Sequence, residues 1–477
     1  MKIFICFCFS LYFYQCYYSQ IPTIDWAKCY GGGGFDRAYS FVQTIDNGYV
    51  VAGYSNSDDV FVTGNHGDAD YWVVKLDSTG NIIWQKSLGG SGTDVANCIR
   101  KTSDGGYIIA GESESNNGDV TVNLGGIDAW IVKLDSAGNI TWQKSFGGVS
   151  VDKVNSIQQT SDGGYIFAGY TASINGNVNY WIVKLDIFGN MNWQKSFGGF
   201  GPDQATSIEQ TFDEGYIVAG YSYSNDGDVS GNHGSSDIWI VKIDATGNLI
   251  WQKSFGGSGN ERTQFDYYGF LPIKQTLDGG YIIAGSSTSN DGDVTGNHGY
   301  SDFWIVKIDP TGNITWQKSL GCTYDDYASS VQQISNGGYI IAGESRLNDG
   351  DVSGNHGSTD FWIVNLDSLG NLVWQKSFGG SSADNIYSIQ ETAEGEYVCV
   401  GSTYSNDGDV IGHYSNEDFW IVKLSEGSLG INEVDPSIHK KLIKIVNIYG
   451  QETVEKPNEL LFYIYSDGYT EKKIIIE

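Results

Sequence analysis

A pair of tryptophans twelve residues apart recurs along this 477-residue chain, and it constrains the fold more than any other feature. Each pair brackets a short motif such as WIVKLDSAGNITW, and six complete pairs use twelve of the 14 tryptophans. The complete pairs are Trp72/Trp84, Trp130/Trp142, Trp181/Trp193, Trp239/Trp251, Trp304/Trp316 and Trp362/Trp374. Trp26 remains in a copy of the second half of the motif, and Trp420 in a copy of the first half. One copy of the repeat is therefore divided between the two ends of the repeat region.

The spacing and content of the repeat predict its architecture. The second tryptophan of each unit, from Trp26 to Trp374, recurs at steps of 58, 58, 51, 58, 65 and 58 residues. Repeats of this kind with internal strand signals are typical of solenoids and propellers. Each unit holds four apolar runs separated by turns rich in Asp, Gly and Asn, the chemistry of hairpins. The sequence thus predicts an all-β, seven-bladed β-propeller of four-stranded blades.

The divided copy predicts how the ring closes. An open ring would leave two sheet edges free to pair with other chains. We expect blade seven to take three strands from about 385–424 and its outer strand from residues 24–30, which places Trp26 and Trp420 in one sheet. The tryptophans are expected to fill the wedges between blades. Blade three, shortened at 175–177, and blade five, with the insertion ERTQFDYYGFLP, should deviate most.

Charge and loop length suggest which end of the ring has a function. The chain has 27 Lys and Arg against 57 Asp and Glu, a net charge of −30, which argues against nucleic acid as a partner. Tight turns join strands one to two and three to four, so the long connections meet at the opposite end. Lysines recur in the third and fourth strands, whereas the acids concentrate in loops. We therefore expect an acidic long-loop face, and loops are the usual carriers of binding function.

The loop NDGDVSGNHG is the strongest candidate for a metal-binding segment. Its closely spaced carboxylates suit Ca²⁺, which takes six to eight oxygen ligands, although the loop lacks the complete EF-hand pattern. The alternative is that these side chains cap the backbone amides of the loop itself. The candidate calcium ligands are Asp226, Asp228, Asp291, Asp293, Asp349, Asp351, Asp407 and Asp409. One loop histidine per blade cannot easily converge on one metal, so we interpret His66, His233, His298, His356 and His413 as parts of their loops.

Catalytic signatures are weak. The chain has no nucleophile elbow, no phosphate-binding loop before a helix and no His-Glu-x-x-His motif. A carboxylate pair for glycoside hydrolysis stays open because Asp is abundant. Near-identical blades argue against catalysis, which needs unique residues, and unique residues concentrate in the blade-five insertion. Its candidates are Arg262, Asp266, Tyr267 and Tyr268.

The N-terminus and the cysteines suggest the compartment. Residues 1–20 have one Lys before an apolar run and are interpreted as a secretory signal peptide, followed by the propeller at 21–424. A membrane anchor is the alternative, but the apolar run is shorter than the about twenty residues that a span needs. No stable membrane span is expected elsewhere. Cys29, Cys98, Cys322 and Cys399 show no metal spacing and no disulfide framework, and a Cys29–Cys399 bridge stays open.

The repeat also resembles a known family. The motifs GGSGxD, SIxxT, DGGYIIAGYS and DFWIVKLDxxGNIxWQKS recur in the same order in nearly every copy over about residues 24–424. They resemble the bacterial seven-bladed β-propeller repeat family, and the outer-strand tryptophan is similar to that of quinoprotein-type blades. The resemblance implies a ring of seven blades.

The tail differs from the repeat. A linker at 425–436 precedes three alternating runs, LIKIVNIYGQ, LLFYIYSDG and EKKIIIE. Residues 437–477 resemble the C-terminal sorting domain of the type IX secretion system of Bacteroidetes. The resemblance implies recognition by the secretion machinery, export, removal of the tail, and release or attachment at the cell surface; a small β cap on the propeller is the alternative. The residues that carry the signal are Gly450, Tyr463, Asp467, Gly468, Lys472 and Lys473.

Three functions follow from these features. The first is a secreted or cell-surface module for binding, adhesion or scaffolding, which meets a protein or glycan through the acidic long-loop face. The second is a polysaccharide-acting enzyme with a site in the central channel or at the blade-five insertion. The third is a passive spacer. The repeated features explain architecture without chemistry, so the sequence favours binding or structure, with Ca²⁺ as the candidate ion and no other cofactor implied.

Overall fold

The computed structural model describes residues 21–174, 176–262, 271–414, 416–425, 442–447, 451–454, 456, 460–465 and 470–474. The chain divides into two compact units, Met1–Glu426 and Gly427–Glu477. Every helix or strand assigned in the described ranges is a β-strand, and these ranges contain no helix that could cross a membrane.

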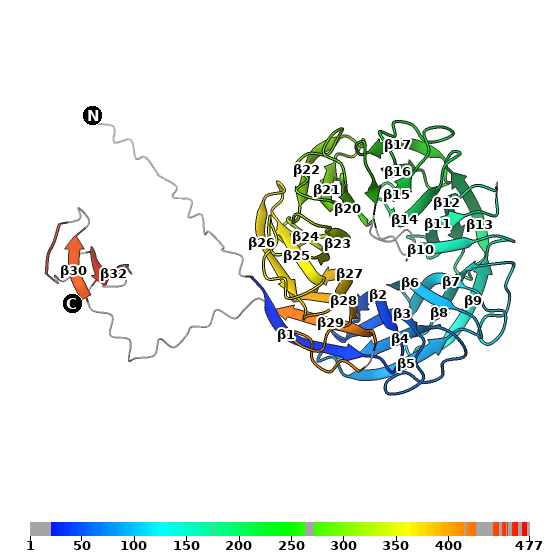
Figure 1. The fold of residues 1–477 in the computed structure, drawn as a ribbon, viewed down its shortest axis with the longest axis horizontal. Coiled ribbons are helices and arrows are strands. Elements are labelled where there is room, and N and C mark those ends of the chain that lie inside the picture. The colour runs from blue at the N-terminus through cyan, green and yellow to red at the C-terminus, as the bar shows by residue number, and fades with distance from the viewer. Residues whose placement is uncertain are drawn as a thin grey trace, which may run out of the picture. The chain divides into compact units, whose positions relative to one another are not determined.

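The first unit is a ring of seven antiparallel blades (Figure 1), which confirms the predicted propeller. Blade one comprises β2 (Asp36–Gln43), β3 (Tyr49–Ser55), β4 (Asp70–Leu76) and β5 (Ile82–Leu88). Blade two comprises β6 (Asp94–Lys101), β7 (Tyr107–Ser113), β8 (Asp128–Leu134) and β9 (Ile140–Phe146). Blade three comprises β10 (Asp152–Gln159), β11 (Tyr165–Thr171), β12 (Asn179–Leu185) and β13 (Met191–Phe197). Blade four comprises β14 (Asp203–Gln210), β15 (Tyr216–Ser222), β16 (Asp237–Ile243) and β17 (Leu249–Phe255). Blade five comprises β18 (Glu261–Arg262), β19 (Ile273–Gln275), β20 (Tyr281–Ser287), β21 (Asp302–Ile308) and β22 (Ile314–Leu320). Blade six comprises β23 (Tyr327–Gln333), β24 (Tyr339–Ser345), β25 (Asp360–Leu366) and β26 (Leu372–Phe378). Blade seven comprises β27 (Asp384–Glu391), β28 (Tyr397–Thr403), β29 (Asp418–Ser425) and β1 (Thr23–Tyr30).

Blade five deviates as predicted, because its innermost strand is interrupted. The pieces β18 and β19 both pair with β20, and the residues between them lie outside the described part of the chain. Blade three keeps four regular strands, and its shortening lies between β11 and β12.

Tight turns gather at one end of the ring because their side chains satisfy their own backbone. In the β4–β5 turn, Asp77 accepts hydrogen bonds from the amides of Thr79 and Asn81, and Gly80 has a φ of 78°, which favours glycine. In the β6–β7 turn, Asp104 forms an ion pair with Lys133 of β8, with Oδ2 of Asp104 2.8 Å from Nζ of Lys133. Lys133 is only 3% exposed. The third-strand lysines therefore bind turn carboxylates at the short-turn end, so acids lie at both ends of the ring.

The core lies between the blades. The first tryptophan of each pair is buried. In four of the six pairs it packs on an aromatic residue of the preceding blade, as Trp130 does on Tyr71 at 4.6 Å between ring centroids. The second tryptophan lies on the outer strand, and in every pair except Trp362/Trp374 a glycine of the next blade lies against it. A Cβ added to Gly138 would lie 3.0 Å from the ring of Trp84. The predicted wedge-filling role is confirmed for the first tryptophan.

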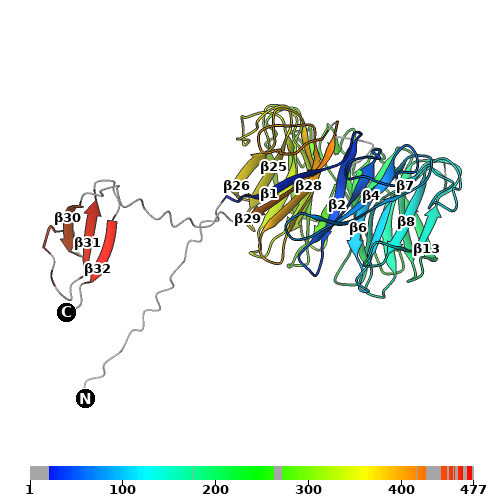
Figure 2. The same ribbon diagram turned by 90° about the horizontal axis from the view of Figure 1, so that it is seen from below.

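The ring closes as the divided repeat predicted. Strand β1 pairs antiparallel with β29, with Trp26 opposite Lys423 and Cys29 opposite Trp420 (Figure 1; Figure 2 shows β1 along the edge of this blade). Phe419 of the same blade packs on Trp72 of blade one, with ring centroids 4.4 Å apart. The two ends of the propeller sequence therefore form one sheet.

The four described cysteines are buried and free. Strand β29 lies between β1 and β28, so Cys29 and Cys399 are two strands apart in the sheet. Two strand spacings exceed about 9 Å, whereas the Cα atoms of a disulfide lie within about 7 Å. The bridge that the sequence left open does not form.

The second unit contains a three-stranded antiparallel sheet of β30 (Leu442–Asn447), β31 (Leu460–Tyr465) and β32 (Thr470–Ile474). Tyr463 is 4% exposed and pairs with Ile445 on one side and Glu471 on the other. The small C-terminal β domain predicted from the sequence is therefore present.

Candidate functional site

The predicted calcium ligands bind backbone amides. In each long loop, the first carboxylate accepts an amide of the loop before the same blade, as Asp349 does from Thr323 at 2.8 Å. The second accepts a glycine amide, as Asp351 does from Gly321 at 3.3 Å. The same bonds hold Asp226, Asp228, Asp291, Asp293, Asp407 and Asp409. Among the described residues, no three His, Cys, Asp or Glu side chains are grouped to hold a metal ion, and calcium binding stays a prediction.

Four loop histidines form fixed pairs with buried carboxylates. The Nδ1 atoms of His66, His233, His298 and His356 lie 2.6–2.8 Å from the Asp four residues later, at the start of the third strand. Burial alone would lower the pKa of His66 and His233, but the hydrogen bond to the carboxylate raises it above its usual value. His413 differs because one more residue separates it from Asp418, and Tyr414 takes the equivalent backbone position. The imidazoles are thus oriented by their own loops.

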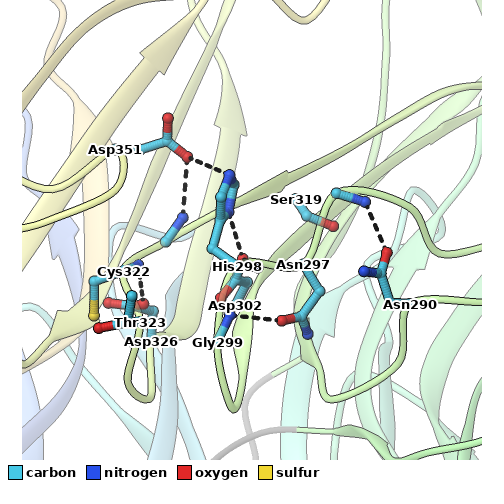
Figure 3. Close-up of polar contacts among 12 residues, drawn as sticks. Asn290, Asn297, His298, Gly299, Asp302, Ser319, Cys322, Thr323, Asp326 and Asp351 are labelled. Carbon is cyan, nitrogen blue, oxygen red and sulfur yellow. Dashed lines mark hydrogen bonds and ion pairs between the residues drawn. The ribbon is translucent and has the colours of Figure 1, made fainter.

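The structure brings the second loop carboxylate opposite the histidine of the preceding blade. Figure 3 shows His298 between Asp302 of its own blade and Asp351 of the next, with Nε2 of His298 3.8 Å from Oδ2 of Asp351. The adjoining groove has a volume of about 370 Å³ and is lined by Gln317 and Lys318 as well. A matching groove of about 460 Å³ holds His233 and Asp293. Asp228 faces blade three, whose shortened loop carries no histidine.

Two buried acids meet next to a glycine at every blade junction except that of blades three and four, where Asn179 takes the place of one acid. A Cβ on Gly89 would lie 2.5 Å from carboxylate oxygens of both Asp70 and Asp94. Asp94 accepts the amide of Gly90, whereas Oδ1 of Asp70 has no hydrogen-bond partner. Burial raises the pKa of Asp94 to about 6 and also raises that of Asp70. The same burial raises the pKa to about 6 in Asp36, Asp326, Asp384 and Asp418.

The central channel is lined by the innermost strands, whose inner edges have no neighbouring strand within their blades. Side chains connect these edges to one another. Asn97 donates to the carbonyl of Val154, Asn155 to that of Ala205, and Ser329 to that of Ile386. These bonds satisfy backbone carbonyl groups at the centre of the ring.

A cavity of about 300 Å³ remains in this channel. Toward the long loops, Tyr39 and Tyr387 meet with ring centroids 5.0 Å apart. At the other end the lining includes Arg100, Lys274 and Gln332, which lie near the C-terminal ends of their strands. These ends lead into the tight turns, so the cavity opens at the short-turn face. None of the described residues that line it is an Asp or Glu.

Arg100 is the unusual group at this opening. It donates to the hydroxyl of Ser40 and to the carbonyl of Ile99, and no described carboxylate lies within ion-pair distance of it. By contrast, Arg37 pairs with Glu417 at 2.8 Å, and Lys274 lies 3.9 Å from Glu209. In a chain of charge −30, an arginine without a carboxylate at a cavity mouth favours an anionic group in the cavity.

One acid near the closed end of the channel is unusual as well. Glu344 is 5% exposed, and its Oε1 has no hydrogen-bond partner. Burial raises its pKa to about 8. Across the ring, Lys153 and Glu112 form a buried ion pair at 2.7 Å. Each of these residues occupies a repeat position that holds another residue type in most blades, which is the signal that sequence reasoning overlooked.

Several predicted residues fall outside the described part of the chain. These are Asp266, Tyr267, Tyr268, Gly450, Asp467 and Gly468, together with the proposed signal peptide. Arg262 lies in β18, and Lys472 and Lys473 lie in β32, opposite Phe462 and Leu461, but their side chains are likewise outside the description.

Comparisons with known proteins add little to this picture. No family model matches the chain. The regulatory protein FlaEY of Caulobacter vibrioides is 26% identical over 212 residues, which is 39% of this chain and only about a fifth (20%) of that protein. The chain is similar to the structure of Sqt1 from Chaetomium thermophilum, with a TM-score of 0.43 at 13% identity over 84% of this chain and 99% of that one. It is also similar to the structure of BamB from Moraxella catarrhalis, with a TM-score of 0.39 at 11% identity over 85% of this chain and 100% of that one. A protein of unknown function from Dyadobacter fermentans has a TM-score of 0.45 at 10% identity, over 85% of this chain and 99% of that one. These similarities assign no family.

Proposed function

We propose that this protein is an exported binding module that holds a carboxylate-bearing saccharide in its central channel, entered from the short-turn face. The observation that carries the proposal is the cavity of about 300 Å³ with Arg100 at its mouth. Hydroxyl and amide groups on its wall suit a ligand rich in hydroxyls, and a guanidinium binds a carboxylate through paired hydrogen bonds.

The proposal favours binding over hydrolysis. Glycoside hydrolysis needs two carboxyl groups on either side of the scissile bond. The described lining contains neither an Asp nor a Glu, whereas serines, asparagines and glutamines come from several blades. The long-loop face, which the sequence favoured, is less suited to a saccharide because its carboxylates are engaged by loop amides.

Replacement of Arg100 tests the binding proposal. The variant Arg100→Gln is expected to bind uronic-acid oligosaccharides at least about tenfold more weakly, because it loses a charge-assisted hydrogen bond worth about 1.5–3 kcal/mol. Neutral oligosaccharides should be affected much less. Isothermal titration with both ligand classes measures the difference, and Lys101→Gln, on the neighbouring residue, is the matched control. Equal affinities of wild type and Arg100→Gln for uronates would contradict the proposal.

Export is proposed from the two ends of the chain. The proposed signal peptide at 1–20 and the sorting tail at 437–477 imply passage through two membranes and surface display or release. The three-stranded sheet β30–β31–β32 supports a compact tail with a fold of its own.

Removal of residues 437–477 tests the export proposal. In a host with type IX secretion, the truncated protein is expected to remain in the periplasm, whereas full-length protein reaches the surface or medium, as fractionation and immunoblotting would show. A variant lacking only residues 475–477 measures how much depends on the extreme C-terminus. Undiminished export of the truncated protein would show that the tail is not the signal.

A further inference from the structure

The loop histidines offer an unused donor atom in a fixed direction. Asp302 accepts hydrogen bonds from the backbone amide of His298 at 2.7 Å and lies 2.8 Å from its Nδ1. A hydrogen bond that fixes Nδ1–H leaves the lone pair on Nε2 of the neutral ring, and a carboxylate behind a histidine is the usual arrangement in metal sites. Figure 3 shows the ring held between Asp302 and Asp351.

The second donor comes from the next blade. Oδ2 of Asp351 lies 3.8 Å from Nε2 of His298. Zinc binds histidine nitrogen at about 2.0–2.1 Å and carboxylate oxygen at about 2.0–2.2 Å, so one ion can bridge atoms at this separation. The side chains of His298 and Asp351 are 40% and 29% exposed, so water from the groove can complete the coordination.

The chemistry of the groove selects among cations. Lys318 also lines it, which disfavours an ion held by charge alone. One imidazole nitrogen and one carboxylate oxygen suit Zn²⁺, Ni²⁺ or Co²⁺, whereas Ca²⁺ prefers a shell of oxygens. The site uses two protein side chains. It therefore agrees with the finding that no three His, Cys, Asp or Glu side chains are grouped to hold a metal among the described residues.

We propose that His298 and Asp351 bind a divalent transition-metal ion between blades five and six. The proposal extends to the residues at the equivalent positions between blades one and two, four and five, and six and seven. The equivalent pairs are His66/Asp119, His233/Asp293 and His356/Asp409. In the first two pairs, the Asp of the next blade contributes to the raised histidine pKa. The proposal is independent of ligand binding in the channel, and it differs from the calcium site predicted from loop carboxylates.

The last loop histidine provides a natural control. The side chain of His413 is only 9% exposed, and its Nε2 is 4.0 Å from Oδ2 of Asp418 in its own blade. The ring of His413 is therefore not presented to a neighbouring blade as His298 is.

The test is metal titration of tag-free protein. Zn²⁺ calorimetry and the visible absorbance of the Co²⁺ complex are expected to show saturable binding, and His298→Gln should remove one equivalent. Asp351→Asn keeps the oriented ring and should weaken that equivalent at least tenfold, whereas His413→Gln should leave the stoichiometry unchanged. Melting curves without metal confirm that the variants are folded. Unchanged stoichiometry in His298→Gln and Asp351→Asn, loss in His413→Gln, or no Zn²⁺ binding at millimolar concentration would overturn the proposal.

Discussion

Deletion of residues 21–30 is expected to lower the free energy of unfolding by about 5 kcal/mol or more, because it removes the strand that closes the ring. Seven residue pairs join β1 to β29, and Cys29 and Tyr30 are buried in the process. The deletion also leaves β29 as an exposed edge, which favours intermolecular pairing. Urea unfolding measures the first effect, and size-exclusion chromatography the second.

Two further variants test whether closure itself is responsible. A synthetic peptide of residues 21–30, added to the truncated protein, should raise its melting temperature in a concentration-dependent way by adding the missing strand. A scrambled peptide is the control. If truncated and intact proteins melt alike, or if both peptides act equally, β1 does not hold the ring closed.

The closing sheet also lacks one bond that the other blades have. In six blades Nε1 of the buried tryptophan donates to a glutamine on the outer strand, as Trp72 does to Gln85 at 2.9 Å. In blade seven Ala27 takes the place of that glutamine, and Nε1 of Trp420 has no partner. We expect Ala27→Gln to stabilise the protein by about 1 kcal/mol. Ala27→Leu, of similar size but without an acceptor, should not.

The closure was predictable from the sequence because it depends on counting. Trp26 and Trp420 were each half of a pair that recurs six times, and a sheet of four strands leaves one place for the missing half. The blades followed from local signals such as Asp77 and Gly80, whose turn chemistry acts within a few residues.

The sites were less predictable because they join residues from different blades. His298 and Asp351 are 53 residues apart, and nothing in either loop shows that they face each other. Arg100 and Lys274 gain meaning only when the inner strands converge on one channel. The pairing of His298 with Asp302 could have been inferred, since the pattern His-Gly-x-x-Asp recurs four times.

The directions of the closely spaced loop acids could not be predicted from the sequence either. Asp349 and Asp351 are two residues apart, and this suggested a shared ion. In the structure, they bind two different amides, those of Thr323 and Gly321. Proximity in sequence gave no information about the direction of the two carboxylates, which depends on a loop about thirty residues upstream.

The protein is expected to be most stable near pH 4 and to lose stability steadily up to pH 8. Burial raises the pKa of Asp36, Asp94, Asp326, Asp384 and Asp418 to about 6, so the stability from their protonated forms is complete below about pH 4 and lost as pH rises through 6. Hydrogen bonds from Asn81 and Thr79 lower the pKa of Asp77 to about 2, and that contribution is lost as pH falls from 4 toward 2. Calorimetry at constant ionic strength should show a melting temperature on the order of 10 °C higher at pH 5 than at pH 8.

Glu344 isolates the upper part of this pH dependence. Burial raises its pKa to about 8, so its contribution is complete below about pH 4.5 and lost as pH rises through 8. Glu344→Gln keeps the shape of the side chain without the charge, and it should stabilise the protein at pH 8 by on the order of 3 kcal/mol. At pH 5 the wild-type carboxyl is already neutral, and the two proteins should melt within about 1 °C of each other. Glu114→Gln, at an exposed acid two residues after Glu112, should change stability little at either pH. A gain from Glu344→Gln that is the same at pH 5 and pH 8 would show that shape, and not the ionisation of a buried carboxyl, limits stability at the centre of the ring.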